Sequence, residues 1–325
     1  MPLIETKGAA SAQGFGLFAK TGGGDGTRGI FALGCCGGCF CVRTKRNKYT
    51  YACCTSTASG VGAASAGSYN GSAAGNATRG IFALGSAPSA STTRNKYTYA
   101  TCTSTACGVA GASKASRRGS AAGNSTRGIF ALGQCAPCFI RSTIRNKYTY
   151  ACCTSTASGV AGASIGSWDG SAAGNSTRGI FALGCTFPTT ANTAMNKYTY
   201  ACCTSTASGV AATTQRADES AATGNSTRGI FQMAAGSDVR NKYTYACCTN
   251  TASGVAVSSV SVSSGPSAAG NSTRGIFALG SASGRSTTRN KYTYATCTST
   301  ACGVGAASAA STCGSAASWA SCVNS

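Results

Sequence analysis

Cysteine is the residue type in this chain whose number and spacing first suggest chemistry. The 325 residues include 21 cysteines, and each copy of a repeated Asn-Lys-Tyr-Thr-Tyr run is followed by two of them. One cysteine comes seven residues after the Asn, and the other comes at six or, in two copies, at twelve. The twelve are Cys53, Cys54, Cys102, Cys107, Cys152, Cys153, Cys202, Cys203, Cys247, Cys248, Cys297 and Cys302. Such regularity predicts disulfides, either between neighbouring repeats or locally within a repeat.

Two further cysteine pairs have a spacing that metal sites use. Cys36 and Cys39 form one Cys-x-x-Cys pair, and Cys135 and Cys138 form another. A structural zinc ion needs four ligands, and these pairs fall in loops of non-adjacent repeats. We therefore expect no metal and no cofactor. Loop disulfides and free thiols stay open as alternatives.

Acid–base chemistry has few residues to draw on. Histidine is absent, which removes the commonest general base. The six carboxylates are Glu5, Asp25, Asp169, Asp218, Glu219 and Asp238, and none of them recurs with the repeat. Paired-carboxylate hydrolysis and a Ser-His-Asp triad are therefore not expected, and we predict that the protein is not an enzyme.

Cationic and aromatic residues mark a different kind of site. The formal net charge is +21, and cations and aromatic rings gather in the two segments that differ between repeats. The predicted ligand-binding residues are Arg43, Lys45, Tyr69, Lys114, Arg117, Arg118, Phe139, Arg141, Trp168, Phe187, Arg216 and Arg285. The Arg and Lys of a repeated Arg-Asn-Lys run are expected on the same face. Such a face would bind a polyanion with steep salt dependence, and its rings would stack on sugars or bases. The alternative is a solvated collar of charges without a ligand.

The elements that position these residues follow from internal repetition. Arg-Gly-Ile-Phe begins at Arg28, Arg79, Arg127, Arg178, Arg228 and Arg274, and alternates strictly with the Asn-Lys-Tyr-Thr-Tyr run. The spacing of about 49 residues is typical of four-stranded propeller blades. In one unit we predict strands at 120–123, 128–132 and 147–154, and a weak fourth strand through Val160. The Asn-Ser-Thr runs between the first two strands read as turns rather than glycan sites.

Side-chain alternation predicts how the units pack. Tyr148, Tyr150 and Cys152 would share one face of the third strand, and Lys147, Thr149, Ala151 and Cys153 the other. The Tyr face of one unit would then pack on the small side chains of the next. In an up-and-down blade the second-to-third and fourth-to-first connections emerge together. We therefore expect all the variation between repeats on one face, where binding loops are usually held.

The ends of the chain suggest how the array closes. The first unit lacks the Ser-Ala-Ala strand, and residues 315–319 supply it at the C-terminus. Pairing of this segment with residues 29–33 would remove exposed edges. We therefore predict an all-β fold, a single six-bladed propeller, with an N-terminal attachment segment at 1–26, repeats at 27–314 and the closing strand and tail at 315–325. The alternative is a linear array that the tail caps.

The repeats also resemble known families. Gly-Ile-Phe-Ala-Leu-Gly followed by a variable loop and a Tyr-containing strand resembles kelch-type propeller repeats, although the kelch Trp is missing. The Thr-Arg-Gly-Ile-Phe-Ala-Leu-Gly and Asn-Lys-Tyr-Thr-Tyr runs are more similar to Gly/Ser/Thr-rich repeats of tailed-bacteriophage structural proteins and related bacterial proteins. Residues 4–16 look like the N-terminus of phage tail-associated proteins. The repeat resemblance implies a propeller, and the N-terminal one implies a virion.

Three functions fit these observations. The first is a virion or tail-associated structural protein that attaches to an anionic host-surface glycan. The second is a bacterial cell-surface or filament-forming protein, and the third is a nucleic-acid binder. We expect other virion, tail or filament subunits as partners, with a homo-oligomer as one form. Location on a virion or cell surface is expected without a signal peptide or membrane insertion.

Overall fold

The computed structural model describes residues 27–32, 34–36, 41–86, 89–137, 140–186, 190–216, 218–234, 236–281 and 284–318. The regular elements in these residues are all β-strands, as predicted. They form six four-stranded antiparallel sheets and three small three-stranded ones. None of the described residues forms a helix long and apolar enough to cross a membrane. The predicted attachment segment, residues 1–26, lies outside the described part of the chain.

The large sheets are numbered one to six by the order of their second strands. Sheet one is β33 (Ser315–Ser318), β1 (Arg28–Ala32), β4 (Arg46–Thr50) and β5 (Thr55–Thr57). Sheet two is β6 (Ser72–Gly75), β7 (Arg79–Ala83), β8 (Arg94–Thr98) and β9 (Thr103–Thr105). Sheet three is β11 (Ser120–Gly123), β12 (Arg127–Ala131), β15 (Arg145–Thr149) and β16 (Thr154–Thr156). Sheet four is β18 (Ser171–Gly174), β19 (Arg178–Ala182), β22 (Met195–Thr199) and β23 (Thr204–Thr206). Sheet five is β24 (Ala221–Gly224), β25 (Arg228–Gln232), β26 (Arg240–Thr244) and β27 (Thr249–Thr251). Sheet six is β28 (Ser267–Gly270), β29 (Arg274–Ala278), β30 (Arg289–Thr293) and β31 (Thr298–Thr300).

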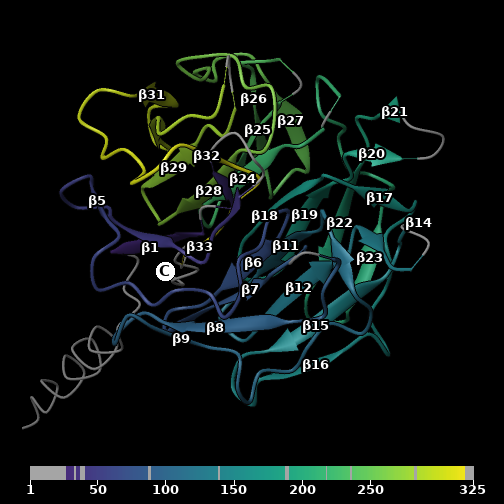
Figure 1. The fold of residues 1–325 in the computed structure, drawn as a ribbon. Coiled ribbons are helices and arrows are strands. Elements are labelled where there is room, and N and C mark those ends of the chain that lie inside the picture. The colour runs from purple at the N-terminus through teal and green to yellow at the C-terminus, as the bar shows by residue number, and fades with distance from the viewer. Residues whose placement is uncertain are drawn as a thin grey trace, which may run out of the picture.

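The sheets are arranged around a common centre in a propeller-like fold. Figure 1 shows the first strands toward the middle and the short fourth strands at the periphery. Each first strand lies against the first strand of the next sheet, in the order β33, β6, β11, β18, β24, β28 and back to β33. The β33 strand pairs with β1, as predicted, and the register runs from Gly29 opposite Ser318 to Ala32 opposite Ser315. Leu33 and Trp319, also predicted in this pair, lie outside the described residues.

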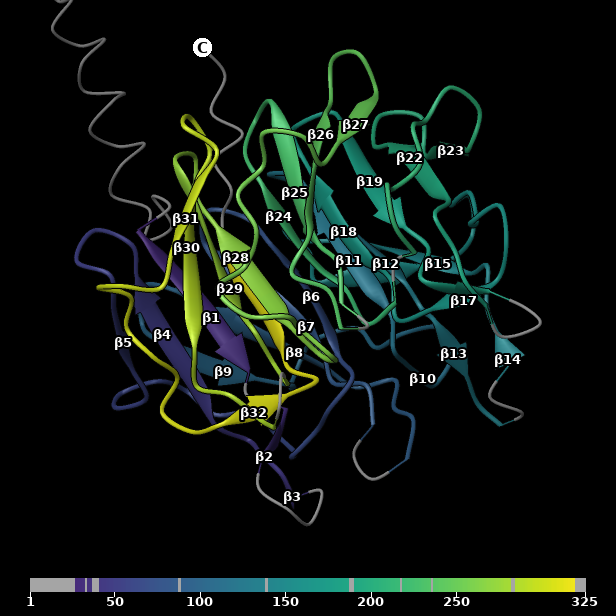
Figure 2. The same cartoon turned by 90° about the horizontal axis from the view of Figure 1, so that it is seen from above.

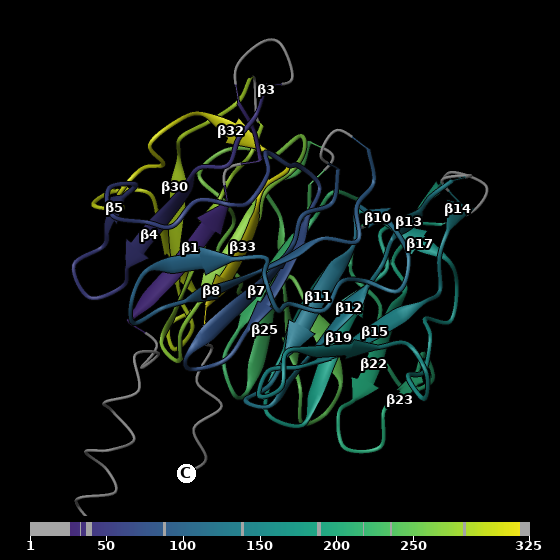
Figure 3. The ribbon, with the colours of Figure 1, turned by 60° about the horizontal axis from the view of Figure 1, so that its bottom comes forward.

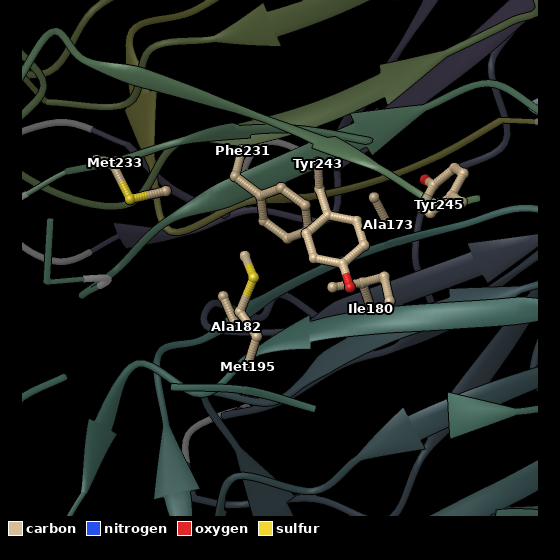
Figure 4. Close-up of a cluster of buried hydrophobic side chains, with 8 residues drawn as sticks. All are labelled: Ala173, Ile180, Ala182, Met195, Phe231, Met233, Tyr243 and Tyr245. Carbon is tan, nitrogen blue, oxygen red and sulfur yellow. The ribbon is translucent and has the colours of Figure 1, made fainter. Parts of the chain in front are cut away.

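The core lies between neighbouring sheets rather than inside any one of them. At the boundary of sheets two and three, Ala74 and Ile81 of one sheet pack on Phe130, Tyr148 and Tyr150 of the other. All six boundaries repeat this arrangement, and Figure 4 shows the one between sheets four and five. The Tyr face therefore packs on a neighbouring sheet, as predicted, but that neighbour is the preceding sheet, and the partners are Ala of its first strand and Ile of its second strand.

Glycine at the start of the second strand makes room for this contact. A Cβ atom at Gly128 would lie 2.8 Å from the hydroxyl oxygen of Tyr150 and 3.1 Å from the Cβ of Ala74. Any larger residue would therefore push the Tyr ring away from the neighbouring sheet.

The strand boundaries correct part of the prediction. The first strand matches residues 120–123, whereas the second begins and ends one residue earlier than expected. The third strand ends at Thr149 rather than at residue 154, because residues 150–153 form a tight turn. The fourth strand is Thr154–Thr156 and does not extend to Val160. A run of Tyr, Ala and Cys has no turn signal of its own, so periodicity alone carried the strand too far.

Candidate ligand-binding face and axial cavity

The two variable segments of each repeat meet on one side of the molecule. Beside sheet three, β10 (Ser116–Arg117) of the incoming connection pairs with β13 (Gln134–Cys135), which pairs with β14 (Ile140–Arg141), and the three form a small sheet of their own. The same arrangement joins β17 (Ser167–Trp168), β20 (Cys185–Thr186) and β21 (Thr190–Ala191), and also β32 (Ser311–Thr312), β2 (Cys35–Cys36) and β3 (Cys41–Val42). Figures 2 and 3 place these small sheets on one side and the hairpins between third and fourth strands on the other. We call the side with the small sheets the loop face.

The cations predicted on the loop face differ in exposure. Exposed side chains are those of Arg43, Lys45, Lys114 and Arg216. Partly buried ones are those of Arg117, Arg118, Arg141 and Arg285, and Tyr69 has the same intermediate exposure. Arg117 donates through Nε to Gln134 at 2.8 Å, across the β10–β13 pair. Phe139 and Phe187 lie outside the described residues.

Trp168 contacts two of these arginines. The guanidinium carbon of Arg141 lies 4.6 Å from the indole centroid, and that of Arg118 lies 5.0 Å from it. Cation–π contacts of this kind hold a guanidinium over an indole ring. Trp168 was predicted to stack on a ligand. In the structure its indole ring contacts these two arginines, and its stacking on a ligand stays a prediction.

The arginines of the Arg-Asn-Lys run do not belong to the loop face, which corrects the prediction. Arg145 has 1% of its surface exposed and reaches into sheet four, where it donates to Ser205 Oγ, at 2.5 Å, and to Asn196 Oδ1. Its guanidinium carbon also lies 4.5 Å from the Phe181 ring centroid. Equivalent contacts are made by Arg46, Arg94, Arg240 and Arg289. Burial lowers the pKa of each of these five arginines to about 10, so they remain charged at neutral pH. The Lys of the run is half-buried in mid-strand, opposite Ile of the second strand.

Sheet four has no arginine at this position, and the hydrogen bonds that replace it show that the buried arginine joins neighbouring sheets. Met195 stands where the other sheets have Arg, and Asn250 of sheet five stands where the other sheets have Ser. The amide of Asn250 donates to Asn241 Oδ1 at 2.8 Å and to the Ala212 carbonyl oxygen at 2.7 Å. In the boundary of sheets three and four, Arg145 donates to the equivalent Asn196 and Gly162 oxygens. One amide therefore replaces one guanidinium from the opposite side of the boundary.

The face opposite the loop face is uniform. Asn124 Oδ1 accepts hydrogen bonds from the backbone N–H of Thr126 and Arg127, so the Asn-Ser-Thr run forms the predicted turn. Asn124 also donates to the Ser176 carbonyl of the next sheet. Arg127 donates to the Tyr200 carbonyl at 2.8 Å, again in the next sheet. Sheet six reaches sheet one in the same way, because Arg274 donates to the Tyr51 carbonyl.

The twelve repeat cysteines are free thiols in the structure, so the predicted disulfides are absent from it. Both cysteines of the Tyr-Ala-Cys-Cys sequence lie in the tight turn, where strand alternation does not apply. Cys152 is exposed and its Sγ lies 3.0 Å from Thr154 Oγ1. Cys153 has a left-handed backbone, φ 56°, and its Sγ lies 3.9 Å from the Tyr150 carbonyl oxygen. The two sulfurs thus contact different groups of their own turn.

The weak metal candidates gain no support from the described residues. Cys135 is a buried free thiol in β13. Cys36 lies in β2, and Cys39 and Cys138 lie outside the described residues. Where the chain is described, three or more His, Cys, Asp or Glu side chains do not gather as metal ligands would.

A cavity in the middle of the loop face brings Arg118, a predicted binding residue, together with residues that the sequence analysis did not single out. It has a volume of about 50 Å³ and lies where the six first strands begin. Each large sheet contributes the residue two positions before its first strand begins. These six lining residues are Asn70, Arg118, Asp169, Glu219, Gly265 and Cys313. We call this space the axial cavity.

The backbone links the six lining residues to one another. All six have a left-handed backbone, with φ between 43° and 59°. The N–H of Asn70 donates to the Cys313 carbonyl, that of Arg118 to the Asn70 carbonyl, and that of Asp169 to the Arg118 carbonyl. Cys313 donates likewise to the Gly265 carbonyl. The shared conformation turns six unlike side chains toward one place.

The axial cavity contains an ion pair and two further titratable side chains. Arg118 and Asp169 form an ion pair at 2.8 Å, in which the Asp169 side chain is 9% exposed. Burial raises the pKa of Asp169 to about 7, against the opposing effect of Arg118. Burial also raises the pKa of Glu219, and raises that of Cys313 to about 11. The cavity can therefore exchange protons near neutral pH.

Alignment of the repeats by their first strands could have found this site. Asp169 and Glu219 occupy the same position in two repeats, and Arg118 occupies it in a third. Their dispersion along the chain made the carboxylates look isolated. The signal was a position, just before the recurring small-residue first strand, whose residue type differs between repeats.

Comparison with known proteins supports the fold only. The chain matches no protein-family model and no curated protein. Among solved structures, 138 chains resemble it. One is the structure of YjhT, with a TM-score of 0.61 over 77% of this chain and 87% of that one, at 12% sequence identity. At this identity the likeness shows a shared fold and carries no function.

Proposed function

We propose that the chain is a closed six-bladed β-propeller that acts, without catalysis, as a virion attachment protein and binds an anionic host-surface glycan through its loop face. The pairing of β33 with β1 supports closure. Arg274 and Arg289 of sheet six donate hydrogen bonds to sheet one, which also supports closure. Equivalent bonds join the other neighbouring sheets that the structure describes, except that the boundary at Met195 lacks the arginine that corresponds to Arg289. The virion setting rests on the resemblance of residues 4–16 to the N-terminus of phage tail-associated proteins.

One observation carries the binding proposal: exposed cations stand on the loops that differ between repeats. Arg43, Lys45, Lys114 and Arg216 are exposed and lie in segments whose length and content vary. Two carboxylates of this face, Asp169 and Glu219, line the axial cavity instead. Asp218 accepts a hydrogen bond from the buried Cys185 thiol at 3.1 Å. The outer loops therefore present positive charge that a polyanion would neutralise.

Glycan fits this face better than a featureless polyanion does. The loops hold guanidinium groups at fixed positions, as at Arg141 over Trp168. Fixed guanidinium groups bind carboxylates and sulfates in defined geometry. The uniform opposite face would then be free to contact other subunits of the particle or a second copy of this chain.

The test is binding of a heparin oligosaccharide, polysialic acid and single-stranded DNA at several salt concentrations. We expect the logarithm of glycan affinity to fall linearly with the logarithm of salt concentration. The double variant Lys114→Ser/Arg216→Ser should bind more weakly, with a slope reduced by about 1–2. The matched control, Lys147→Ser/Lys242→Ser, removes the same charge from mid-strand positions and should bind as the original protein does.

Two results would contradict the proposal. One is the absence of salt-sensitive glycan binding, which would favour a purely structural role. The other is equal weakening by both double variants, which would mean that net charge rather than the loop face binds the anion. Preference for DNA over both glycans would favour the nucleic-acid alternative.

A further inference from the structure

Positive charge on the loop face is concentrated beside sheet three. Because the five arginines of the Arg-Asn-Lys run are buried, eight of the predicted cations remain on this face. Four of the eight lie in the connection into sheet three or in its hairpin, and they are Lys114, Arg117, Arg118 and Arg141. Residues 114–168 contain no Asp or Glu, and Asp169, which follows, is paired with Arg118. The loop face thus attracts anions most strongly at this sheet.

Strand pairing places two of these arginines on either side of a glutamine. In the small sheet of β10, β13 and β14, Arg117 lies opposite Gln134, and Gln134 lies opposite Arg141. Residues directly opposite each other on antiparallel strands share one face of the sheet. The three side chains therefore form a row, which we call the cationic row. Neighbouring strands are about 4.8 Å apart, so the two arginines begin about 10 Å apart.

Both guanidinium groups are held in position, and both lean in the same direction along the row. Arg117 donates through Nε to Gln134 at 2.8 Å, toward the next strand. The guanidinium carbon of Arg141 lies 4.6 Å from the ring centroid of Trp168, which belongs to β17. A β-bridge joins the end of β14 to β17, and Figures 2 and 3 show β17 beside the small sheet. Since each arginine leans by one strand, the spacing of about 10 Å is kept.

The row has hydrogen-bond donors that no described residue uses. Gln134 is only 6% exposed, and its Nε2 donates no hydrogen bond within the described part of the chain. In Arg141 only Nε is enclosed without a partner, and the two terminal nitrogens remain available. Buried polar groups usually have a partner. The partner of these donors must supply acceptors, and the positive charge makes it an anion.

The spacing of the row selects among anionic glycans. A guanidinium group binds one carboxylate or sulfate in a bidentate geometry. Where charged and neutral sugars alternate, successive acidic groups are one disaccharide apart, and an extended disaccharide spans a length comparable to that between the two arginines. The neutral sugar would then lie over Gln134, whose amide can donate to a hydroxyl or acyl oxygen. A glycan charged on every sugar would instead place an anion beside Gln134, which has no charge to neutralise it.

We propose that the cationic row binds a glycan in which acidic and neutral sugars alternate. One acidic group binds Arg117, the next binds Arg141, and the neutral sugar between them accepts a hydrogen bond from Gln134. Lys114 lies close enough to Cys135, the neighbour of Gln134 on β13, for its charge to act on that thiol, so it adds to the positive field. This inference rests on the proposed function and specifies the sheet and the class of glycan.

The test is calorimetric titration of the full chain with a hyaluronan oligosaccharide, in which glucuronate alternates with N-acetylglucosamine. A polysialic acid oligomer with the same number of carboxylates is the comparison ligand, because it is charged on every sugar. We expect hyaluronan to bind at least tenfold more tightly than this oligomer. Arg117→Gln/Arg141→Gln should weaken hyaluronan binding at least tenfold. The matched control, Arg43→Gln/Arg216→Gln, removes the same charge from other sheets of the loop face and should weaken it less than threefold.

A neutral substitution separates the row from a general field of charge. Gln134→Leu keeps the size of the side chain and removes its amide. It should weaken hyaluronan binding without changing the salt dependence, since no charge is lost. Melting temperatures show whether each variant folds. If one does not, hydrogen exchange of the unaltered protein still tests the site, because bound hyaluronan should slow exchange most at residues 114–118 and 134–137.

Three results would overturn the proposal: equal weakening by the two double variants, equal affinity for the two glycans, or exchange that slows equally at all sheets. In each case a glycan still binds, so the proposed function of the loop face would stand. If no glycan binds in a salt-sensitive way, the proposed function itself is contradicted, and this inference with it.

Discussion

Individual buried arginines join one sheet to the next. Arg145 bonds to Ser205, Asn196 and the Gly162 carbonyl and stacks on Phe181, with neutral partners throughout. Its charge is tolerated because every contact is made by an oriented dipole or an aromatic ring. Where Met195 replaces Arg, Asn250 supplies the missing donors from the other side. The boundary at Met195 is thus a natural example in which an asparagine compensates for the loss of the buried arginine.

This compensation can be transferred to another boundary. Arg145→Met should destabilise the protein by about 2 kcal/mol, since hydrogen bonds of a charged group are lost and buried acceptors remain. Adding Ser205→Asn should recover at least half of that loss, because it recreates the pair found at Met195 and Asn250. Urea unfolding of the two single variants and the double variant measures the coupling. Strictly additive effects would show that the amide does not replace the guanidinium.

A second residue-scale prediction concerns Asp169. Its folded-state pKa, about 7, lies above the usual carboxyl value, so the folded state holds a proton that the unfolded state has already released between about pH 4 and 7. Stability should therefore fall as pH rises through this window, by at most about 1.4 kcal/mol per pH unit. Asp169→Asn should flatten that slope in urea unfolding measured from pH 4 to 8. An unchanged slope would place the titration elsewhere.

At the scale of elements, the turn between the third and fourth strands decides where the cysteines point. Alternation predicted a continuous strand through both cysteines, but the chain turns at residues 150–153 and the second cysteine takes the left-handed position. Single-sequence patterns show strands well, since apolar alternation has period two. They miss a turn made of Tyr, Ala and Cys, because these residues are not typical turn formers. The first strand, by contrast, was predicted correctly from its Gly and Asn neighbours.

The two classes of thiol should differ in reactivity. The exposed cysteines are Cys53, Cys107, Cys152, Cys202, Cys247 and Cys302. A hydrogen bond from Thr154 lowers the pKa of Cys152, and equivalent bonds lower those of Cys53, Cys202 and Cys247. Iodoacetamide should label the exposed class at least tenfold faster than the partly buried class in native protein, as read by peptide mass spectrometry. Resistance of all twelve to labelling without reductant would restore the predicted disulfides.

At the scale of the whole molecule, the described boundaries between sheets share one packing plan, and the C-terminus supplies the first strand of sheet one. The sequence was sufficient for this topology, since the missing Ser-Ala-Ala strand and its position at the other end are visible in the repeats. It was not sufficient for the charge distribution. The five buried arginines look identical to surface cations in a sequence, and only packing against the neighbouring sheet shows that they are internal. The axial cavity depends on all six repeats at once, so no single motif could predict it.

Removal of the closing strand tests this topology. A chain that ends at Gly314 lacks β33, leaves the edge of β1 unpaired and removes Ala317 from the boundary with sheet two. We expect a lower melting temperature and aggregation through the exposed edge. A chain that ends at Ser318 keeps the strand and should behave like the full chain. Equal melting and a monomeric state for both truncations would show that the strand does not complete the fold.

The most direct measurement of the central claim is hydrogen–deuterium exchange of the protein with and without a bound heparin oligosaccharide. The account predicts that the ligand slows exchange in the loop-face segments around Lys114, Ile140 and Arg216. The Asn-Ser-Thr turns and the third-to-fourth-strand turns of the opposite face should not change. Protection confined to those uniform turns would contradict the assignment of the binding surface.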